Sequence, residues 1–279
     1  MLGTEDAFRS QVTVVCREPT GMRHQTQTNR TSSMKKVIYA IAALSVASGL
    51  RAEQAKSTYS ITTDFTYASE YIFRGVENAG NSFQPSVEFN SGDFSLNLWT
   101  NQPVTKHEND EIDLSGSYTY KVSPALKLEG VLTSYNYPEA RGGQTEDSFE
   151  AGIGATYTVA GLSPSLYYYH DLTLKADTLQ AAVGYSLPLE AIGASVDTSI
   201  YAGTVDSRDT APDAGGPDIR ESYSYYGVDV SVPYKLNNNA TWTIAAHYAE
   251  NRNLAGVGGT FGTLGKRNLW FTTGITIGF

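Results

Sequence analysis

The sequence lacks three features that mark other classes of protein. It has a single cysteine, Cys16, among 279 residues. No run reaches about 18 apolar residues, so no segment is suited to a transmembrane helix. Basic residues are scarce, with 20 lysines and arginines against 29 aspartates and glutamates. So acidic a chain repels nucleic-acid phosphates, and we expect no nucleic-acid partner.

The most apolar run, residues 37–50, has the layout of a secretory signal peptide. It follows a Met-Lys-Lys start at residues 34–36 and leads to Ala52, which gives a basic start, a short apolar core and a small final residue. The pattern predicts a signal peptide over residues 34–52, cleaved after Ala52. Cleavage after Ala47 is the alternative. The remainder of the chain is therefore expected to be exported.

Residues 1–33 precede this signal and show no periodic pattern. We expect Met34 to be the true start and residues 1–33 to be an upstream extension assigned in error; a genuine, disordered extension is the alternative. Residues 1–52 hold seven of the 20 basic residues, three of the 29 acidic ones and Cys16. The expected mature chain, residues 53–279, therefore has 13 basic and 26 acidic residues, a net charge of −13, and no thiol for a disulfide or metal site.

Apolar and polar residues alternate with period two from residue 57 to the end of the sequence. Such alternation indicates strands with one apolar face, and helical spacing does not fit it. We expect about twelve strands, many with the roughly nine to eleven residues that a tilted strand needs to cross a bilayer. The expected strands span residues 58–73, 83–90, 93–101, 110–122, 126–137, 148–159, 164–172, 177–187, 194–205, 222–234, 240–250 and 268–279.

The connections between these strands alternate in length. Those after the second, fourth, sixth, eighth and tenth strands are tight, whereas the longest of the others, residues 206–221 and 251–267, are rich in Gly, Asp or Asn. Short periplasmic turns and long outer loops are typical of an outer-membrane barrel, and an even strand count puts both termini on the periplasmic side. The sequence predicts an all-β fold: a transmembrane antiparallel up-and-down β-barrel of about 12 strands in the bacterial outer membrane, with residues 53–279 as a single domain.

A secreted β-sandwich is the alternative fold because its strands also alternate. Two features favour the barrel. Aromatic residues such as Tyr59, Tyr118 and Tyr234 recur at strand ends on the apolar face, as interfacial girdles require. The opposite face carries carboxylates in mid-strand, which suits a wet lumen.

The last expected strand carries an assembly signal on its apolar face. Phe271, Ile275, Ile277 and Phe279 lie on that face, opposite small or polar residues. This segment resembles the terminal strand of bacterial outer-membrane barrels, whose C-terminal aromatic residue is read by the barrel-assembly machinery. The resemblance implies that outer-membrane lipid and this machinery are partners of the chain.

The start of the expected mature chain carries a family resemblance. Residues 67–76 read YASEYIFRGV, and residues 84–87 read QPSV. This arrangement resembles the opening of the Gcw_chp-type family of uncharacterised bacterial outer-membrane proteins, which has a Tyr-x-aromatic-Arg-Gly motif before a Pro-containing second strand. That family often has a Ser/Thr-Gln pair after the motif, where this chain has Glu77-Asn78. The resemblance implies a barrel and transfers no activity.

The polar face of the strands supplies the pore candidates. If the odd residues of the first strand face lipid, Arg74 faces the lumen at the outer mouth. An acidic interior of this kind favours cations because it raises their local concentration. The alternative is an internal network of hydrogen bonds and ion pairs that plugs a narrow barrel. The candidates are Arg74, Asp64, Glu88, Glu111, Asp113, Lys121, Lys127, Glu129, Glu150, Asp171, Asp197, Asp229 and Trp270, joined on the same face by Trp99, Tyr135, Tyr167, Tyr169 and Tyr201.

No catalytic, metal or cofactor site is expected. His170 has lipid-face parity, but positions 168 and 172 are Tyr and Leu, so no serine nucleophile lies two residues away. The aspartates of residues 206–218 lack the regular spacing of a calcium loop. We therefore expect a non-enzymatic barrel, a narrow porin-like passive channel for small solutes. A non-conducting structural or surface-interaction barrel that uses its long outer loops is the alternative.

Overall fold

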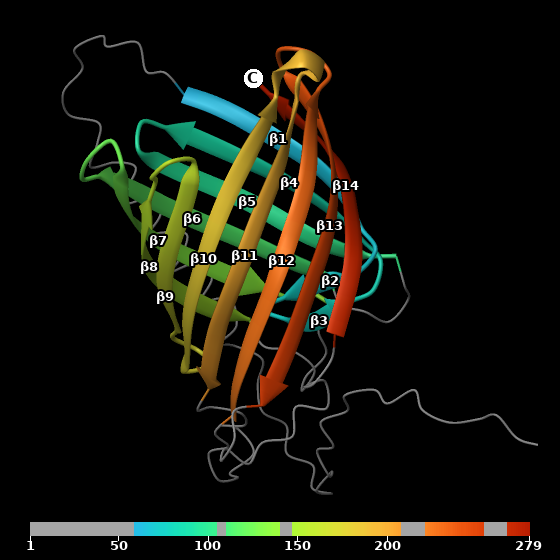
Figure 1. Cartoon of the computed structure of the whole chain (residues 1–279). Helices are drawn as coiled ribbons and strands as arrows, with labels where there is room; N and C mark the ends of the chain where they lie inside the picture. Colours follow the sequence, from blue (N-terminus) through green and yellow to red (C-terminus); the bar gives the residue numbers. More distant parts are fainter. Residues whose placement is uncertain (1–58, 105–109, 140–146, 208–220, 254–266) are drawn as a thin grey trace, which may run out of the picture. The chain divides into compact units, whose positions relative to one another are not determined.

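Twelve strands close into the antiparallel β-barrel that the alternating pattern predicts (Figure 1). The computed structural model describes residues 59–104, 110–139, 147–207, 221–253 and 267–279. The expected signal peptide and the segment before it lie outside these residues. The barrel strands are β1 (Tyr59–Ala68), β4 (Ser82–Ser91), β5 (Phe94–Pro103), β6 (Glu111–Lys121), β7 (Leu126–Asn136), β8 (Ser148–Tyr157), β9 (Leu162–Asp171), β10 (Ala176–Leu189), β11 (Ala194–Ser207), β12 (Glu221–Lys235), β13 (Ala240–Asn253) and β14 (Arg267–Gly278).

Each barrel strand pairs with its neighbours in sequence, and the first strand closes the ring against the last. β1 pairs with β14 in a register that places Thr66 opposite Gly274. The Phe279 amide donates to the Ile61 carbonyl at 2.8 Å. Closure leaves the barrel sheet without an open edge, so the backbone polar groups of each barrel strand find partners in its neighbours. No helix in the described part of the chain has the length and apolar character needed to span a bilayer.

The two ends of the barrel differ. Five short turns and Phe279 lie at one end, called here the turn end, and a 3₁₀ helix at Glu190–Ile192 forms one of these turns. At the opposite end, called here the loop end, β9 and β10 are joined by residues 172–175. The two longest loops expected from the sequence lie mostly outside the described residues, since 208–220 and 254–266 are not described. In an outer-membrane barrel the turn end is periplasmic.

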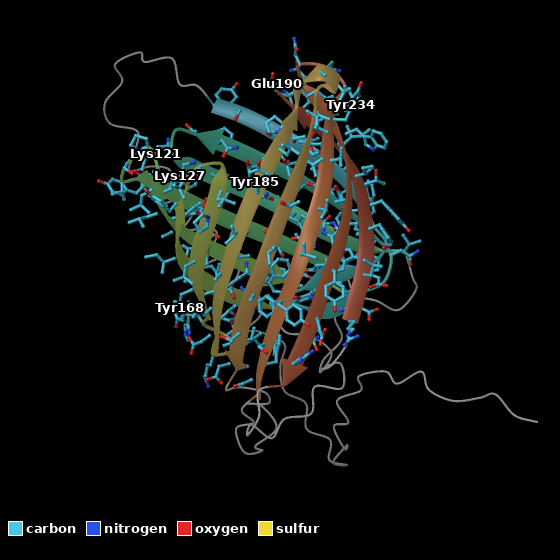
Figure 2. All side chains as sticks on the ribbon, viewed as in Figure 1. Lys121, Lys127, Tyr168, Tyr185, Glu190 and Tyr234 are labelled. Carbon is cyan, nitrogen blue, oxygen red and sulfur yellow. The ribbon has the colours of Figure 1, made fainter. Side chains whose placement is uncertain are left out.

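The exterior of the barrel is apolar and is bounded by aromatic residues. Ile153, Ile200 and Leu269 are among its most exposed side chains. Tyr234 lies near the turn end and Tyr168 near the loop end (Figure 2). Water would disfavour so much exposed apolar surface, whereas the hydrocarbon of a bilayer would bury it. The protein is therefore an outer-membrane barrel, and the β-sandwich alternative is excluded by the closed ring of strands.

The strand expected over residues 58–73 is wrong beyond Ala68. β1 ends there, and the chain turns to form a separate two-stranded sheet of β2 (Tyr71–Phe73) and β3 (Val76–Ala79) before β4 begins. Ala68 and Ser82 face each other across β1 and β4, so this small hairpin is an insertion between two paired barrel residues. The sequence pattern does not reveal this break, because Tyr71 and Phe73 continue the period-two spacing of Phe65 and Tyr67.

Tyrosines lie flat against the inner wall where the neighbouring strand has glycine. Tyr167 covers Gly154, and Tyr201 covers Gly227. A side chain at either glycine would overlap the tyrosine ring, so these rings can lie against the backbone only because no Cβ is present. This packing fills the margin of the lumen with aromatic rings and leaves a narrower space at its centre.

Candidate functional site: a hairpin across the barrel lumen

The hairpin of β2 and β3 turns through two residues, Arg74 and Gly75. Phe73 pairs with Val76, and the two residues between them have φ angles of 49° and 78°. Two consecutive positive φ angles are typical of the tight turn that matches the twist of a hairpin. A Cβ at Gly75 would lie 2.7 Å from Cβ of Tyr225, so glycine is required both by the backbone and by the close approach to β12.

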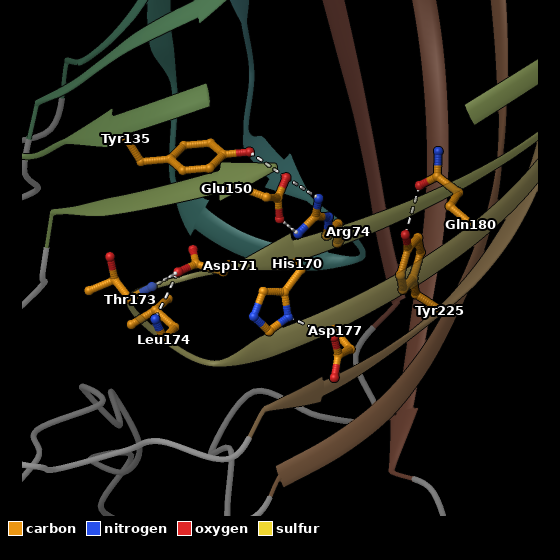
Figure 3. Close-up of polar contacts among 10 residues, drawn as sticks. All are labelled: Arg74, Tyr135, Glu150, His170, Asp171, Thr173, Leu174, Asp177, Gln180 and Tyr225. Atoms are coloured by element: carbon orange, nitrogen blue, oxygen red, sulfur yellow. Dashed lines mark hydrogen bonds and ion pairs between the residues drawn. The ribbon is translucent and has the colours of Figure 1, made fainter. Parts of the chain in front are cut away.

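Arg74 anchors the hairpin to β8 through a bidentate ion pair with Glu150. Its Nη1 and Nη2 donate to the two carboxylate oxygens at 2.7 and 2.8 Å (Figure 3). The Tyr135 hydroxyl donates to the same carboxylate at 3.1 Å. The guanidinium also lies 4.9 Å from the ring centre of Tyr169. Burial opposes the charge of Arg74, but the hydrogen bond and charge of Glu150 raise the pKa of the guanidinium overall.

The opposite side of the hairpin tip contacts β12 and β13. The Gly75 carbonyl accepts a buried hydrogen bond from the Asn251 side-chain amide. Val76 packs against a small apolar cluster formed by Val205, Tyr223 and Tyr225. Contacts with β8 on one side and with β11 to β13 on the other mean that the hairpin crosses the lumen.

The base of the hairpin is fixed by Tyr71, which lies in the lumen against β5. Its ring is 5.3 Å from the ring of Trp99. Burial raises the pKa of Tyr71, and the nearby carboxylates of Glu111 and Asp113 raise it further, so the phenol stays protonated. Glu111 accepts a hydrogen bond from the Tyr137 hydroxyl at 3.1 Å. Phenol and carboxylate groups therefore pack beneath the hairpin at the loop end of β6.

A cavity of about 780 Å³ occupies the lumen beside the hairpin. Its wall includes Glu129 and Asp229 as well as Glu150. Among the described residues, Arg74 and His247 are the basic side chains that line it. The cavity is therefore acidic apart from these two groups, and both of them are already engaged with carboxylates.

Aromatic side chains contact two of the carboxylates that line the cavity. Tyr167 donates to Glu129 at 2.8 Å. The Nδ1 atom of His247 lies 2.8 Å from Asp229, and its ring stacks on Trp270 at 5.0 Å. The Tyr225 hydroxyl donates to Gln180 at 2.7 Å. These contacts give the cavity wall fixed polar groups separated by flat rings.

The remaining pore candidates lie elsewhere on the inner wall or at its rim. Asp171 accepts the backbone amides of Thr173 and Leu174 at 2.9 and 2.7 Å, and so shapes the β9–β10 turn. Lys121 pairs with Asp93 at the turn end, where it faces Lys127 across β6 and β7 (Figure 2). The other three acids bond polar neighbours on the wall: Asp64 with Thr66 and Thr276, Glu88 with Asn90, and Asp197 with Ser186.

The structure brings together residues that the sequence treats separately. Glu150 and Arg74 lie 76 positions apart, and the parity of the first strand places Tyr71 and Phe73 on the lipid face. Both rings are inside the barrel instead, because the chain turns inward after Ala68. His247, which faces Asp229, is also absent from the expected pore set. The Arg74-Gly75 pair after an aromatic run was the one local signal for this turn.

No group of three or more metal-ligating side chains occurs among the residues that the structure describes. On the exterior, Nδ1 of His170 lies 2.8 Å from Asp177, which also accepts from the Tyr168 hydroxyl. This arrangement places a phenol beside the imidazole–carboxylate pair.

The chain resembles several solved barrel structures in overall fold. No protein-family profile and no curated protein sequence matches the chain. Solved structures similar to it include the NanC porin (9% identity, TM-score 0.48, covering 78% of this chain and 98% of that one). The KdgM porin has 13% identity and a TM-score of 0.48, with 78% of this chain and 99% of that one covered. LpxR from Salmonella typhimurium has 8% identity and a TM-score of 0.46, with 77% of this chain and 99% of that one covered. At these identities and TM-scores, the likenesses carry no information about function.

The substitution Arg74→Met is expected to release the hairpin from the wall. It leaves Glu150, which is 4% exposed, without its counter-charge, and breaking one side of a buried ion pair costs about 3–5 kcal/mol. Amide hydrogen exchange of residues 71–79 should therefore accelerate by at least about 100-fold while the barrel strands stay protected. Lys127→Met, which removes a basic residue at the turn-end rim, is the control. Unchanged exchange of the hairpin in Arg74→Met contradicts the anchoring role.

Proposed function

We propose that the protein is a narrow passive channel for small solutes that favours cations, and that the hairpin of β2 and β3 sets its width. The observation that carries this proposal is the acidic cavity in the lumen, which the hairpin borders at its loop-end side. A closed barrel of twelve strands lies between small filled barrels and open porins in size, so a feature inside the lumen decides how wide the passage is.

The charge balance of the cavity supports a preference for cations. Arg74 is neutralised by Glu150, so its positive charge does not attract anions into the passage. Glu129 accepts a hydrogen bond from the Tyr167 hydroxyl, and its carboxylate lines the cavity without a basic partner among the described contacts. Carboxylates in a confined, water-filled space raise the local concentration of cations and lower that of anions.

The aromatic rings of the wall support small solutes rather than large ones. Tyr167 and Tyr169 stack at 5.8 Å, and both line the cavity. Together with the hairpin they leave a passage with flat apolar surfaces between fixed polar groups. Such a surface admits hydrated ions and small ring-bearing solutes and excludes folded or bulky molecules.

A non-conducting structural barrel is the second candidate, and one observation favours it. The hairpin tip is buried against both sides of the lumen through Arg74, Gly75 and Val76. If these contacts close the passage, the long connections expected from the sequence, residues 206–221 and 251–267, would meet the partners of the protein in place of the lumen. Ion current through the purified barrel separates the two candidates.

In planar bilayers, the folded protein is expected to carry a small, ohmic current. Under a salt gradient, the sign of its reversal potential should be that of a cation-selective channel. The isosteric variants Glu129→Gln and Asp229→Asn each remove one negative charge from the cavity wall, so each should move the reversal potential toward zero. Asp177→Asn removes a carboxylate that faces the exterior, and it should leave the potential unchanged.

Two outcomes count against the channel. Absence of current from folded protein supports the structural barrel instead. The reversal potential could instead be the same in wild type, Glu129→Gln and Asp229→Asn. The protein would then still be a channel, but the acidic cavity would not be the source of its preference for cations.

We also propose that Phe279, with Phe271, Ile275 and Ile277 on the same exterior face, is recognised by the barrel-assembly machinery. The register supports this because Phe279 lies beside Ile61 at the seam where β14 meets β1. Arg74 and Gly75 of the hairpin belong to the motif that resembles the Gcw_chp-type family. On the basis of this motif we propose that the chain is a member of that family.

Deletion of Phe279 is expected to lower the amount of folded protein in the outer membrane several-fold and to leave the current per folded molecule unchanged. Phe279→Tyr keeps an aromatic ring and is the control. Heat-modifiable gel migration measures the folded fraction. Normal levels of the deletion variant would remove the proposed role of this residue in assembly.

A further inference from the structure

Two arginines lie side by side on the exterior of the barrel at its loop end. Glu250 of β13 pairs in register with Arg267 of β14, and Arg252 is the next residue of β13 that faces outward. The same register places Tyr248 opposite Leu269, so this face of both strands continues into the apolar exterior. The arginines are therefore attached to the lipid-facing side of the barrel and do not contribute to the lumen.

Glu250 holds both guanidinium groups in place. Arg252 Nε donates to Glu250 Oε1 at 2.7 Å, and Arg267 Nε lies 3.2 Å from Glu250 Oε2. The hydroxyls of Tyr226 and Tyr248 donate to Oε2 at 2.6 and 3.0 Å. The carboxylate thus accepts hydrogen bonds from three side chains and forms an ion pair with a fourth, Arg267. These contacts come from three neighbouring strands and fix the two cations next to each other.

The cluster presents positive charge to its surroundings. One carboxylate cannot neutralise two guanidinium groups, so the cluster carries a net charge of about +1. The Glu250 side chain is 6% exposed, whereas those of Arg252 and Arg267 are 61% and 71% exposed. A simple internal ion pair would not leave both cations at the surface. This arrangement stands out in a chain whose overall charge is −9.

The depth of the cluster matches the border of the apolar belt. Leu269 and Phe271, the next outward-facing residues of β14, are 61% and 55% exposed. Arg267 lies two residues before Leu269, about 7 Å further toward the loop end. Tyr226 and Tyr248 flank the cluster, as aromatic residues do at the interface between hydrocarbon and headgroups. The arginines are therefore placed at the level of lipid headgroups.

We propose that Arg252 and Arg267 bind a phosphate group of a phosphorylated glycolipid in the outer leaflet, with Glu250 as the positioning residue. Arginine recognises phosphate through charge-assisted hydrogen bonds, and two adjacent guanidinium groups match its several oxygens. The apolar side chains immediately below provide a surface for the acyl chains. A lipid phosphate gains from both contacts, whereas free phosphate gains only from the first. This inference is independent of whether the lumen conducts.

The test measures retention of bis-phosphorylated lipid A by the detergent-solubilised full chain, using native mass spectrometry. Removing both arginines alone would leave Glu250 unpaired, so the main variant is Glu250→Gln/Arg252→Gln/Arg267→Gln, with each arginine variant also made singly. Lys235→Gln, at the exposed turn end of β12, is the matched control. Dephosphorylated lipid A and inorganic phosphate are the comparison probes, and heat-modifiable migration verifies folding.

Wild type and Lys235→Gln are expected to bind lipid A equally, and the triple variant at least about 10-fold more weakly. Each single arginine variant should show an intermediate loss. Wild type should bind dephosphorylated lipid A as weakly as the triple variant binds lipid A, and millimolar inorganic phosphate should not displace the lipid. Three results would each overturn the proposal. The first is that the folded triple and single variants bind lipid A as tightly as wild type does. The others are that wild type binds dephosphorylated lipid A as tightly as lipid A, or that inorganic phosphate displaces the lipid.

Discussion

The requirement that every backbone polar group find a partner within the bilayer governs this structure. The pairing of β1 with β14 meets it by removing the sheet edges, and it fixes which side of each strand faces lipid. Once the ring is closed, successive residues of a strand must face the lipid and the lumen in turn. Apolar residues form the exterior, and the carboxylates and tyrosines of the other face share a confined interior.

That confined interior explains why one arginine has so large a role. An insertion between Ala68 and Ser82 enters the lumen, where a buried guanidinium needs a counter-charge. Glu150 supplies it from β8, and Asn251 bonds the adjacent carbonyl from β13. The same ion pair that fixes the hairpin also removes positive charge from the cavity. In the proposed channel, this contact would therefore affect both the width and the charge of the lumen.

Much of the barrel could be predicted from the sequence because period two records which face of a strand meets lipid. Boundaries of most strands and the tight turns follow from that pattern, and the closed barrel follows once the alternating connection lengths and the aromatic strand ends are added. The inward hairpin does not, since Tyr71 and Phe73 continue the alternation of Phe65 and Tyr67 although they face a different environment. Its position depends on contacts with distant residues, such as Asn251, 176 positions from Gly75, which local patterns do not contain.

We propose that the hairpin sets the width of a conducting lumen. A variant without it replaces residues 69–81 with an Asn-Gly turn, which joins two residues that already face each other across β1 and β4. Single-channel conductance of this variant is compared with that of wild type in planar bilayers. The variant is expected to have a several-fold larger conductance, with its preference for cations reduced little. Equal conductance of the two folded proteins, or no current through either, would contradict this proposal.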